Sequence, residues 1–217
     1  MFKKLILLFT FFLIQITNSK ADWNNINFPF NDHLNSIFVN QFNTNNALIA
    51  GNEGIYFTNT SVNGTWVKLQ ITGSMADQIL YNATQFKRIG ASSNNDSLYI
   101  CGEDTVNHRA VIFTFNLVSH NYSVSFIGSN GTSLNGIFVR GQYIIAVGNA
   151  GYLVAKYDVN PYQIYNTNTT QNLYAVSANF SNKFAVVGHE VHLDIVTNGN
   201  NLTINTYSAN GQIMKAI

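Results

Sequence analysis

Short apolar runs recur along the chain in pairs. The first run of each pair opens with leucine or phenylalanine, and the second run ends in glycine. The first runs cover residues 34–37, 86–89, 134–137 and 173–176, and the second runs cover residues 47–51, 98–102, 144–148 and 184–188. The closing glycines are 40 to 51 residues apart. This spacing is typical of one four-stranded blade in a propeller.

Two further β-rich runs follow each closing glycine. Several of them alternate apolar and polar residues, as half-buried strands do, and no long stretch has the helical period. The third runs cover residues 55–57, 111–115, 152–154 and 191–196, and the fourth runs cover residues 66–69, 122–126, 162–164 and 202–204. The pattern predicts an all-β fold, a β-propeller of about four four-stranded antiparallel blades, with repeats at about 34–72, 86–128, 134–166 and 173–207.

The ends of the repeated region add parts of a further blade. Residues 23–28, which begin with Trp23, have the pattern of a fourth strand, and residues 214–217 have that of a first strand. Propellers hide their blade edges by closing into a ring. We therefore expect either that four blades close on themselves with Trp23 at the seam, or that the sequence is a truncated piece of an incomplete, larger ring. A long joint between the first two repeats predicts an insertion near residues 73–81.

Parts of the third repeat (134–154) and of the first (54–69) resemble known repeats. They are similar to the repeats of photosystem-assembly-factor-type propellers and of sialidase-like Asp-box propellers. An Asp-box hairpin reads Ser-x-Asp-x-Gly-x-Thr-Trp, whereas residues 59–64 before Thr65 and Trp66 read Asn-Thr-Ser-Val-Asn-Gly, so the aspartate is absent. The resemblance implies a propeller fold and leaves the activity open, since one fold carries many functions.

The beginning of the chain has the pattern of a cleavable export signal. Two lysines precede an apolar run over residues 5–16, and the small residues Ser19 and Ala21 suit cleavage. The run is shorter than the ~18 to 20 residues that span a bilayer, although a retained anchor is the alternative. We predict a signal peptide at residues 1–21 and a propeller domain at 22–217. The mature protein is then secreted or periplasmic, without stable membrane insertion.

Composition narrows the class of protein. With 46% hydrophobic and 10% charged residues, the chain can bury a core and exposes mainly neutral polar groups. The formal net charge is +1 and no basic stripe occurs, so no nucleic-acid partner is expected. The one cysteine, Cys101, lies in an apolar run. We expect it to be buried and unreactive.

Two sets of residues have the types found in catalytic or metal sites. Sialidases hold a carboxylate with three arginines, and this chain has Arg88, Arg109 and Arg140, but no Tyr-Glu nucleophile pair is recognisable beside them. His189 and His192 are metal-ligand types, but on one strand they point to opposite faces and share a metal only if a turn intervenes. We therefore assign no catalytic residue, no metal and no cofactor.

The turns between second and third strands form the preferred candidate site. In a propeller they emerge on the same face as the connections between blades, and loops on a rigid scaffold commonly carry binding sites. The insertion adds apolar side chains to this face. The candidate residues are Asn52, Glu53, Glu103, Asp104, Asn149, His189 and Glu190, with Met75 and Tyr81 from the insertion.

These observations favour a secreted or periplasmic, non-catalytic binding or scaffolding propeller whose ligand is a protein or a glycan. The alternative is a glycan-active hydrolase of sialidase-like architecture, which needs carboxylates and arginines in a single pocket. A plainer interpretation is that the turns simply collect polar residues.

Overall fold

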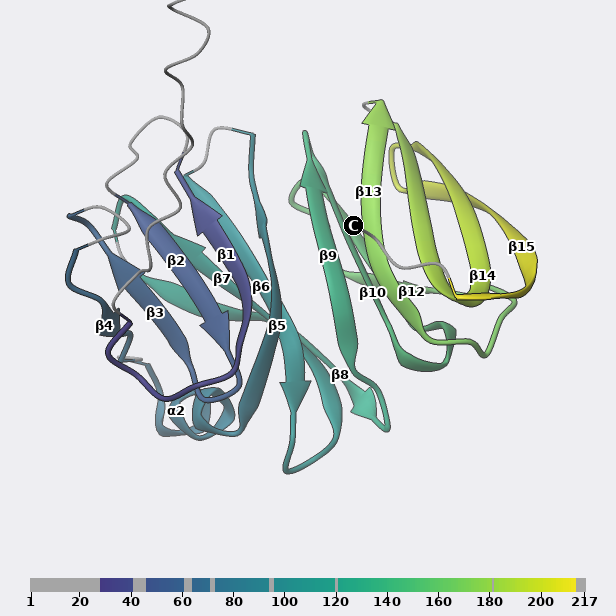
Figure 1. Ribbon diagram of the computed structural model, residues 1–217. Helices are drawn as coiled ribbons and strands as arrows, with labels where there is room; N and C mark the ends of the chain where they lie inside the picture. The colour runs from purple at the N-terminus through teal and green to yellow at the C-terminus, as the bar shows by residue number, and fades with distance from the viewer. Residues whose placement is uncertain are drawn as a thin grey trace, which may run out of the picture.

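The computed structural model describes residues 28–40, 46–60, 64–70, 73–93, 96–119, 121–180 and 182–213. The strands form four antiparallel sheets, which follow one another in chain order from left to right in Figure 1. Each sheet coincides with one of the four predicted repeats, so the prediction of about four antiparallel blades is confirmed.

Strands that are consecutive in the chain are neighbours in every sheet. The first blade contains β1 (Leu34–Val39), β2 (Ala47–Gly51), β3 (Ile55–Thr58) and β4 (Val67–Lys68). The second contains β5 (Thr84–Ala91), β6 (Ser97–Asp104), β7 (Arg109–Asn116) and β8 (Tyr122–Asn130). The third contains β9 (Leu134–Arg140), β10 (Tyr143–Gly148), β11 (Leu153–Tyr157) and β12 (Gln163–Tyr165), and the fourth contains β13 (Leu173–Phe180), β14 (Lys183–Asn198) and β15 (Asn201–Ile213).

The fourth blade has three elements because its second and third strands are joined in β14. The backbone N–H of Thr197 donates to the carbonyl of Asn182 at 2.9 Å, so the end of β14 lies beside its beginning. Glu190 has a φ of 56°, which is typical of a tight turn. The extended chain of β14 therefore doubles back at His189 and Glu190 and supplies both middle strands of this blade.

Three apolar layers of the core lie between neighbouring blades, and a further buried cluster lies on the outer face of the first blade. Alternate residues of a strand contribute to opposite layers, as the period of two requires. In β6, Leu98 and Ile100 pack toward the first blade, whereas Cys101 packs toward the third. Each fully buried Leu, Ile or Phe side chain stabilises the fold by about 1.5 to 3 kcal/mol. The layers therefore hold the blades together without a disulfide.

Aromatic residues that precede β1 cover the outer face of the first blade. The ring centroids of Phe28 and Phe30 lie 5.0 and 4.7 Å from that of Tyr56, and Phe28 also meets Trp66 edge-on at 5.8 Å. Tyr56 and Trp66 are buried as a result. Phe28 is the last residue of the extra strand predicted at 23–28. Trp23, the predicted seam residue, lies outside the described residues.

The four blades form an open arc over the part of the chain that the structure describes. The first strands of neighbouring blades contact one another in order, β1 with β5, β5 with β9 and β9 with β13. Within the same residues, β13 and β1 share no comparable contact. Apolar side chains of β1, such as Ile37, are exposed at this end of the arc. The expectation of an incomplete ring fits this arrangement.

Every blade carries a β-bulge near the start of its first strand. The bulged residues are Asn35, Lys87, Asn135 and Tyr174, each followed by a shift in the pairing register. A closing glycine of the second strand lies opposite each bulge. A Cβ at Gly102 or Gly148 would collide with the carbonyl oxygen of Gln85 or Ser133, respectively. The repeated glycines therefore permit the bulges, and a bulge re-aims one side chain out of the pleat.

The insertion between the first two blades is the helix α2 (Met75–Asn82). Ser74 caps it, because its Oγ accepts from the backbone N–H of Asp77 at 3.2 Å and donates to the Asp77 carboxylate at 2.8 Å. The sequence pattern predicted an insertion here and no helix. The Ser-x-x-Asp capping motif was the available signal. In the described ranges, no helix combines the length and apolar character that a membrane crossing requires.

Cys101 is buried with no exposed surface, as predicted, and burial raises the pKa of its thiol to about 12. Because the thiolate is the reactive form, we expect folded protein at pH 8 to resist the thiol reagent DTNB. Protein unfolded in guanidinium should react rapidly and stoichiometrically, and free glutathione provides the control for reagent activity. Labelling of folded protein at the rate of glutathione would show that the thiol is accessible.

Candidate functional site

The predicted candidate turns gather at one end of the blades, which we call the turn face. The start of each first strand pairs with the end of the second, as Leu34 does with Gly51 and Leu173 with Gly188. The turn face contains the turns 52–53, 105–108, 149–151 and 189–190, together with residues 69–70, 73–83, 131–133 and 166–172 of the connections between blades. In Figure 1, α2 marks this end at the lower edge of the view.

Side chains from the bulges link neighbouring blades along the inner edge of the turn face. Asn35 Nδ2 donates to Asn52 Oδ1, and also to the carbonyl oxygen of Phe86 in the second blade, both at 2.8 Å. The backbone N–H of Asn52 donates to the carbonyl of His33 at 3.1 Å. The candidate residue Asn52 thus fixes the first blade to the second through Asn35.

The same arrangement continues across the next two blades. Lys87 Nζ lies 3.2 Å from Glu103 Oε2 and 3.2 Å from Asn135 Oδ1 of the third blade. Asn135 Nδ2 donates to Asn149 Oδ1 at 2.9 Å and to the carbonyl of Leu173 in the fourth blade at 3.0 Å. Two more candidate residues, Glu103 and Asn149, therefore hold the bulged side chains in place.

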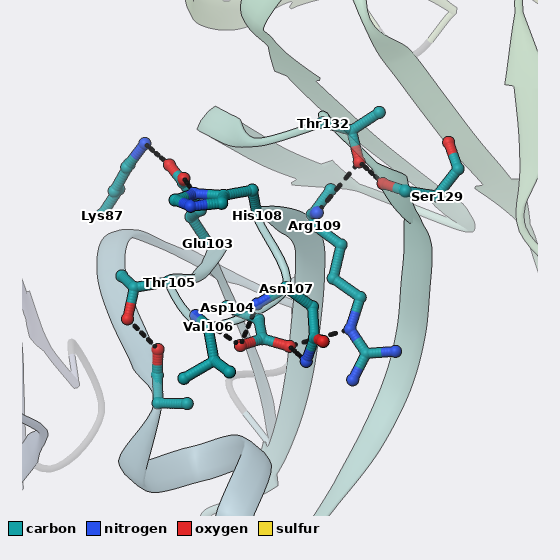
Figure 2. Close-up of polar contacts among 12 residues, drawn as sticks. Lys87, Glu103, Asp104, Thr105, Val106, Asn107, His108, Arg109, Ser129 and Thr132 are labelled. Atoms are coloured by element: carbon teal, nitrogen blue, oxygen red, sulfur yellow. Dashed lines mark hydrogen bonds and ion pairs between the residues drawn. The ribbon is translucent and has the colours of Figure 1, made fainter.

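Asp104 anchors the turn of the second blade (Figure 2). Its side chain is 1% exposed and accepts from Arg109 Nε at 2.8 Å, from Asn107 Nδ2 at 2.9 Å and from the backbone N–H of Val106 at 3.1 Å. Burial raises the pKa of the Asp104 carboxyl, but the hydrogen bonds from Asn107, Arg109 and Val106 outweigh it, so the pKa lies below its usual range. Asp104 therefore shapes the turn and is not accessible to a ligand.

Glu103, the residue before Asp104, has a partly exposed carboxylate. One carboxylate oxygen lies 3.2 Å from Lys87 Nζ and the other 3.4 Å from His108 Nδ1. Figure 2 shows the Lys87 and His108 side chains meeting the Glu103 carboxylate. We call these three residues the charged cluster. It places groups of both signs next to the inner edge of the turn face.

Apolar side chains are exposed on α2 and on the second-blade turn that follows Glu103. Met75 and Ile79, one helical turn apart on α2, are 80% and 63% exposed, and Val106 in the second-blade turn is 72% exposed. Thr105 donates through its backbone N–H and its Oγ1 to the carbonyl of Ala83, at 2.8 and 2.9 Å. These bonds hold the turn against the end of α2. Met75, Ile79 and Val106 are together called the apolar patch.

Tyr81, which the sequence analysis placed on this face, lies in the core and is 4% exposed. Its hydroxyl accepts from the backbone N–H of Ile55 and donates to the carbonyl of Leu69, both at 3.0 Å. Its ring packs against Phe86 and Phe113, and burial raises the pKa of the phenol. Tyr81 therefore attaches α2 to the blades and does not contact solvent.

The fourth blade contributes a polar pocket to the turn face. The pocket has a volume of about 570 Å³ and lies between the connection 166–171, the turn residue Glu190 and β15 residues such as Thr206. His189 Nδ1 lies 3.2 Å from Gln171 Oε1. Of the candidate residues, Glu190 lines this pocket, and His189 contacts the lining residue Gln171.

The candidate residues line an extended edge and do not meet in one pocket. Glu53 is exposed in the first blade, where its backbone N–H donates to the Asp32 carboxylate at 3.0 Å. Glu103 and Asn149 are joined through the bulge residues in the middle of the arc. Glu190 belongs to the fourth blade. A ligand that contacts all of them would have to be long.

The three arginines do not gather around one carboxylate-binding position. Arg109 is held by Asp104 at the turn face. Arg140 ends β9 at the opposite end of its blade and donates to the carbonyl of Ala178 at 3.5 Å. Arg88 is exposed on β5. The arrangement lacks the convergence that the sialidase-like alternative requires.

The two histidines of β14 have separate partners. His189 contacts Gln171, whereas His192 Nε2 lies 2.9 Å from Asp194 Oδ1 and its ring stacks on Tyr207. Among the described residues, no group of three or more His, Cys, Asp or Glu side chains is placed to hold a metal ion. The structure thus gives His189 and His192 different neighbours on β14.

Four similar antiparallel blades, packed face to face in chain order, define the chain as a β-propeller. It is similar to YCF48 from Cyanidioschyzon merolae, with a TM-score of 0.61 and 14% identity over 87% of the chain. It is also similar to YCF48 bound to D1 peptide (TM-score 0.59, 12% identity, 88% of the chain) and to an ancestral GH74 enzyme (TM-score 0.55, 17% identity, 85% of the chain). The resemblance to photosystem-assembly-factor propellers is confirmed for the fold.

The chain spans 61% and 57% of the two YCF48 chains and 25% of the GH74 enzyme. No protein-family model and no curated protein matches the sequence. At these identities the solved structures establish the propeller architecture, and function has to be argued from the site itself.

The role of Asp104 predicts a pH-dependent loss of stability. Asp104→Asn should lower the free energy of unfolding at pH 7 by about 1 to 3 kcal/mol, because buried donors lose a charged acceptor. A folded-state pKa below the unfolded value of ~3.9 stabilises the fold above that value, and this contribution disappears as the pH falls. Urea unfolding at pH 7 and pH 3 should therefore show a smaller difference from the parent at pH 3.

The exposed Asp158 provides a matched control. Asp158→Asn should change the unfolding free energy by less than about 0.5 kcal/mol at either pH. A difference between Asp104→Asn and the parent that is equal at pH 3 and pH 7 would contradict the assigned role.

Proposed function

We propose that this protein is a non-catalytic propeller that binds an extended polypeptide segment along its turn face. We further propose that it acts outside the cytoplasm, as a secreted or periplasmic protein, after removal of residues 1–21. The second proposal is supported by the two lysines, the apolar run and the small residues of that segment.

The observation that carries the binding proposal is the apolar patch on α2 and on the second-blade turn that follows Glu103. Met75, Ile79 and Val106 expose most of their surface at positions that the capped helix and the Thr105–Ala83 bonds keep fixed. Exposed apolar side chains gathered on a rigid surface mark interaction sites, and methionine is common at adaptable binding surfaces. The neighbouring groups of both charges supply hydrogen-bonding partners for a peptide backbone.

The shape of the turn face supports a polypeptide as the ligand. An extended peptide advances by about 3.3 Å per residue and presents side chains alternately on two sides, so it can follow an edge shared by several blades. One of the similar solved structures is YCF48 bound to D1 peptide. A propeller of comparable fold therefore accommodates a peptide, whereas a glycan ligand has no corresponding support.

The glycan-active alternative is less well supported by the geometry. Its active site requires arginines and carboxylates around a common centre. Arg109 instead pairs with the buried Asp104, and Arg140 lies at the opposite end of its blade. The similarity to a GH74 enzyme concerns a quarter of that chain and describes the fold alone.

The apolar patch predicts which substitutions weaken peptide binding. Peptides selected from a random display library on the parent protein should bind the double variant Met75→Ser/Val106→Ser at least tenfold more weakly. Such a loss equals about 1.4 kcal/mol, which corresponds to roughly 60 Å² of apolar surface at ~25 cal/mol per Å². Isothermal titration calorimetry with the purified protein measures the change.

The chain offers a matched control on the opposite end of the blades. Val118 and Val159 lie in turns between third and fourth strands and are 77% and 86% exposed. Val118→Ser/Val159→Ser should bind the same peptides within twofold of the parent. Equal losses in both double variants, or a library that yields no binding peptide, would refute the proposed function.

A further inference from the structure

Of the described residues that line the pocket of the fourth blade, Glu190 alone has an ionisable side chain. The rest of the lining consists of amides and hydroxyls, such as Asn168, Thr170 and Ser208, together with Val191. Among the residues that the structure describes, no basic side chain lines the pocket. A carboxylate surrounded by neutral polar groups gives the pocket a negative potential.

The Glu190 carboxylate is available to a ligand. Its side chain is half-buried at the pocket wall, and among the described residues it makes no hydrogen bond or ion pair. The nearby His189 is oriented toward Gln171, at 3.2 Å. A half-buried carboxylate without a cationic partner is an acceptor with free lone pairs on both oxygens.

The turn conformation fixes the direction in which the Glu190 side chain leaves the backbone. Glu190 adopts a φ of 56° in a two-residue turn, a conformation that glycine or asparagine adopts more readily. The equivalent residue of the third blade, Ala150, has a φ of 51°, so the fourth blade differs from it in placing a carboxylate at this position.

The volume and chemistry of the pocket select a class of ligand. A space of about 570 Å³ admits a long side chain together with water. A carboxylate binds a guanidinium through two parallel hydrogen bonds and an ammonium through one strong bond. The amide and hydroxyl groups around it accept the remaining N–H donors of either cation.

We propose that this pocket is the subsite for a basic side chain, arginine or lysine, of the polypeptide that binds the turn face. The assignment of a polypeptide rests on the proposed function, but the preference for a cation rests on the pocket alone. The subsite fixes the register of the bound segment, because a basic residue enters at the fourth blade while apolar residues reach the patch near the second blade.

Single-residue probes test the subsite independently of any peptide. N-acetyl-arginine amide and N-acetyl-lysine amide are titrated into the isotope-labelled full chain at low salt and followed by NMR. Their neutral counterparts are N-acetyl-citrulline amide and N-acetyl-norleucine amide. We expect the cationic probes to bind at least tenfold more tightly and to shift the signals of Glu190, Gln171 and Thr206.

Two variants localise the effect. Glu190→Gln should abolish the preference for cations, whereas Glu53→Gln, which removes the same charge from the equivalent turn of the first blade, should retain it. Glu190→Gly should also lose the preference while raising the melting temperature, since glycine relieves the backbone strain. Equal binding of arginine and citrulline probes, or equal losses in Glu190→Gln and Glu53→Gln, would overturn the subsite.

The outcomes separate this inference from the proposed function. Cationic probes that bind through Glu190, in a protein that binds no selected peptide, would uphold the subsite and refute the polypeptide ligand. Selected peptides that depend on the apolar patch and ignore the charge at Glu190 would uphold the proposed function and refute the subsite.

Discussion

The β-bulge opposite each closing glycine is the feature on which the architecture of the turn face depends. In the last three blades, a Cβ on the closing glycine would collide with a carbonyl oxygen just before the bulge, as at Gly148 and Ser133. In the first blade, a Cβ at Gly51 would collide with the Asp32 carboxylate. The bulge takes one residue per blade out of the pleat. In three blades that residue, Asn35, Lys87 or Asn135, hydrogen-bonds to the following blade. The local geometry of the bulge therefore also joins neighbouring blades, because it directs these side chains toward the next blade.

The bulges also explain why some candidate residues bind bulged side chains and others do not. Asn52, Glu103 and Asn149 immediately follow the closing glycines, so they lie within reach of the bulged side chains and bind them. In the fourth blade the bulged residue is Tyr174, and His189 contacts Gln171 instead. Among the described residues, the Glu190 side chain does not bind a bulged residue. The turns that hold the blades together are thus mainly structural, and the ligand-facing groups lie beside them.

Much of the fold could be predicted from the sequence because strand periodicity and closing glycines are local signals. All four repeats and the burial of Cys101 follow from them. The helix α2 was missed because eight residues show too little periodicity. The capping pair Ser74 and Asp77 was its only strong sign.

The candidate site was harder to predict because exposure depends on tertiary contacts. Asp104 and Tyr81 have residue types common in binding sites, yet both are buried. Tyr81 hydrogen-bonds to Ile55, which is distant in the sequence, whereas Asp104 accepts from the backbone of its own turn. The opposite holds for Val106, whose apolar character suggests a core residue, although the turn exposes it. In a strand, the period of two predicts the face toward which a side chain points. A turn has no such period, so the sequence does not predict the direction of its side chains.

The central claim is that a polypeptide binds the end of the propeller formed by α2 and the turns between second and third strands. Hydrogen-exchange mass spectrometry with and without a library-selected peptide tests it most directly, because binding protects the contacted backbone. We expect slower exchange in residues 74–83 and 105–108, with no change in the opposite turns 117–119 and 158–160. Protection confined to the opposite turns, or no protection at saturating peptide, would contradict it.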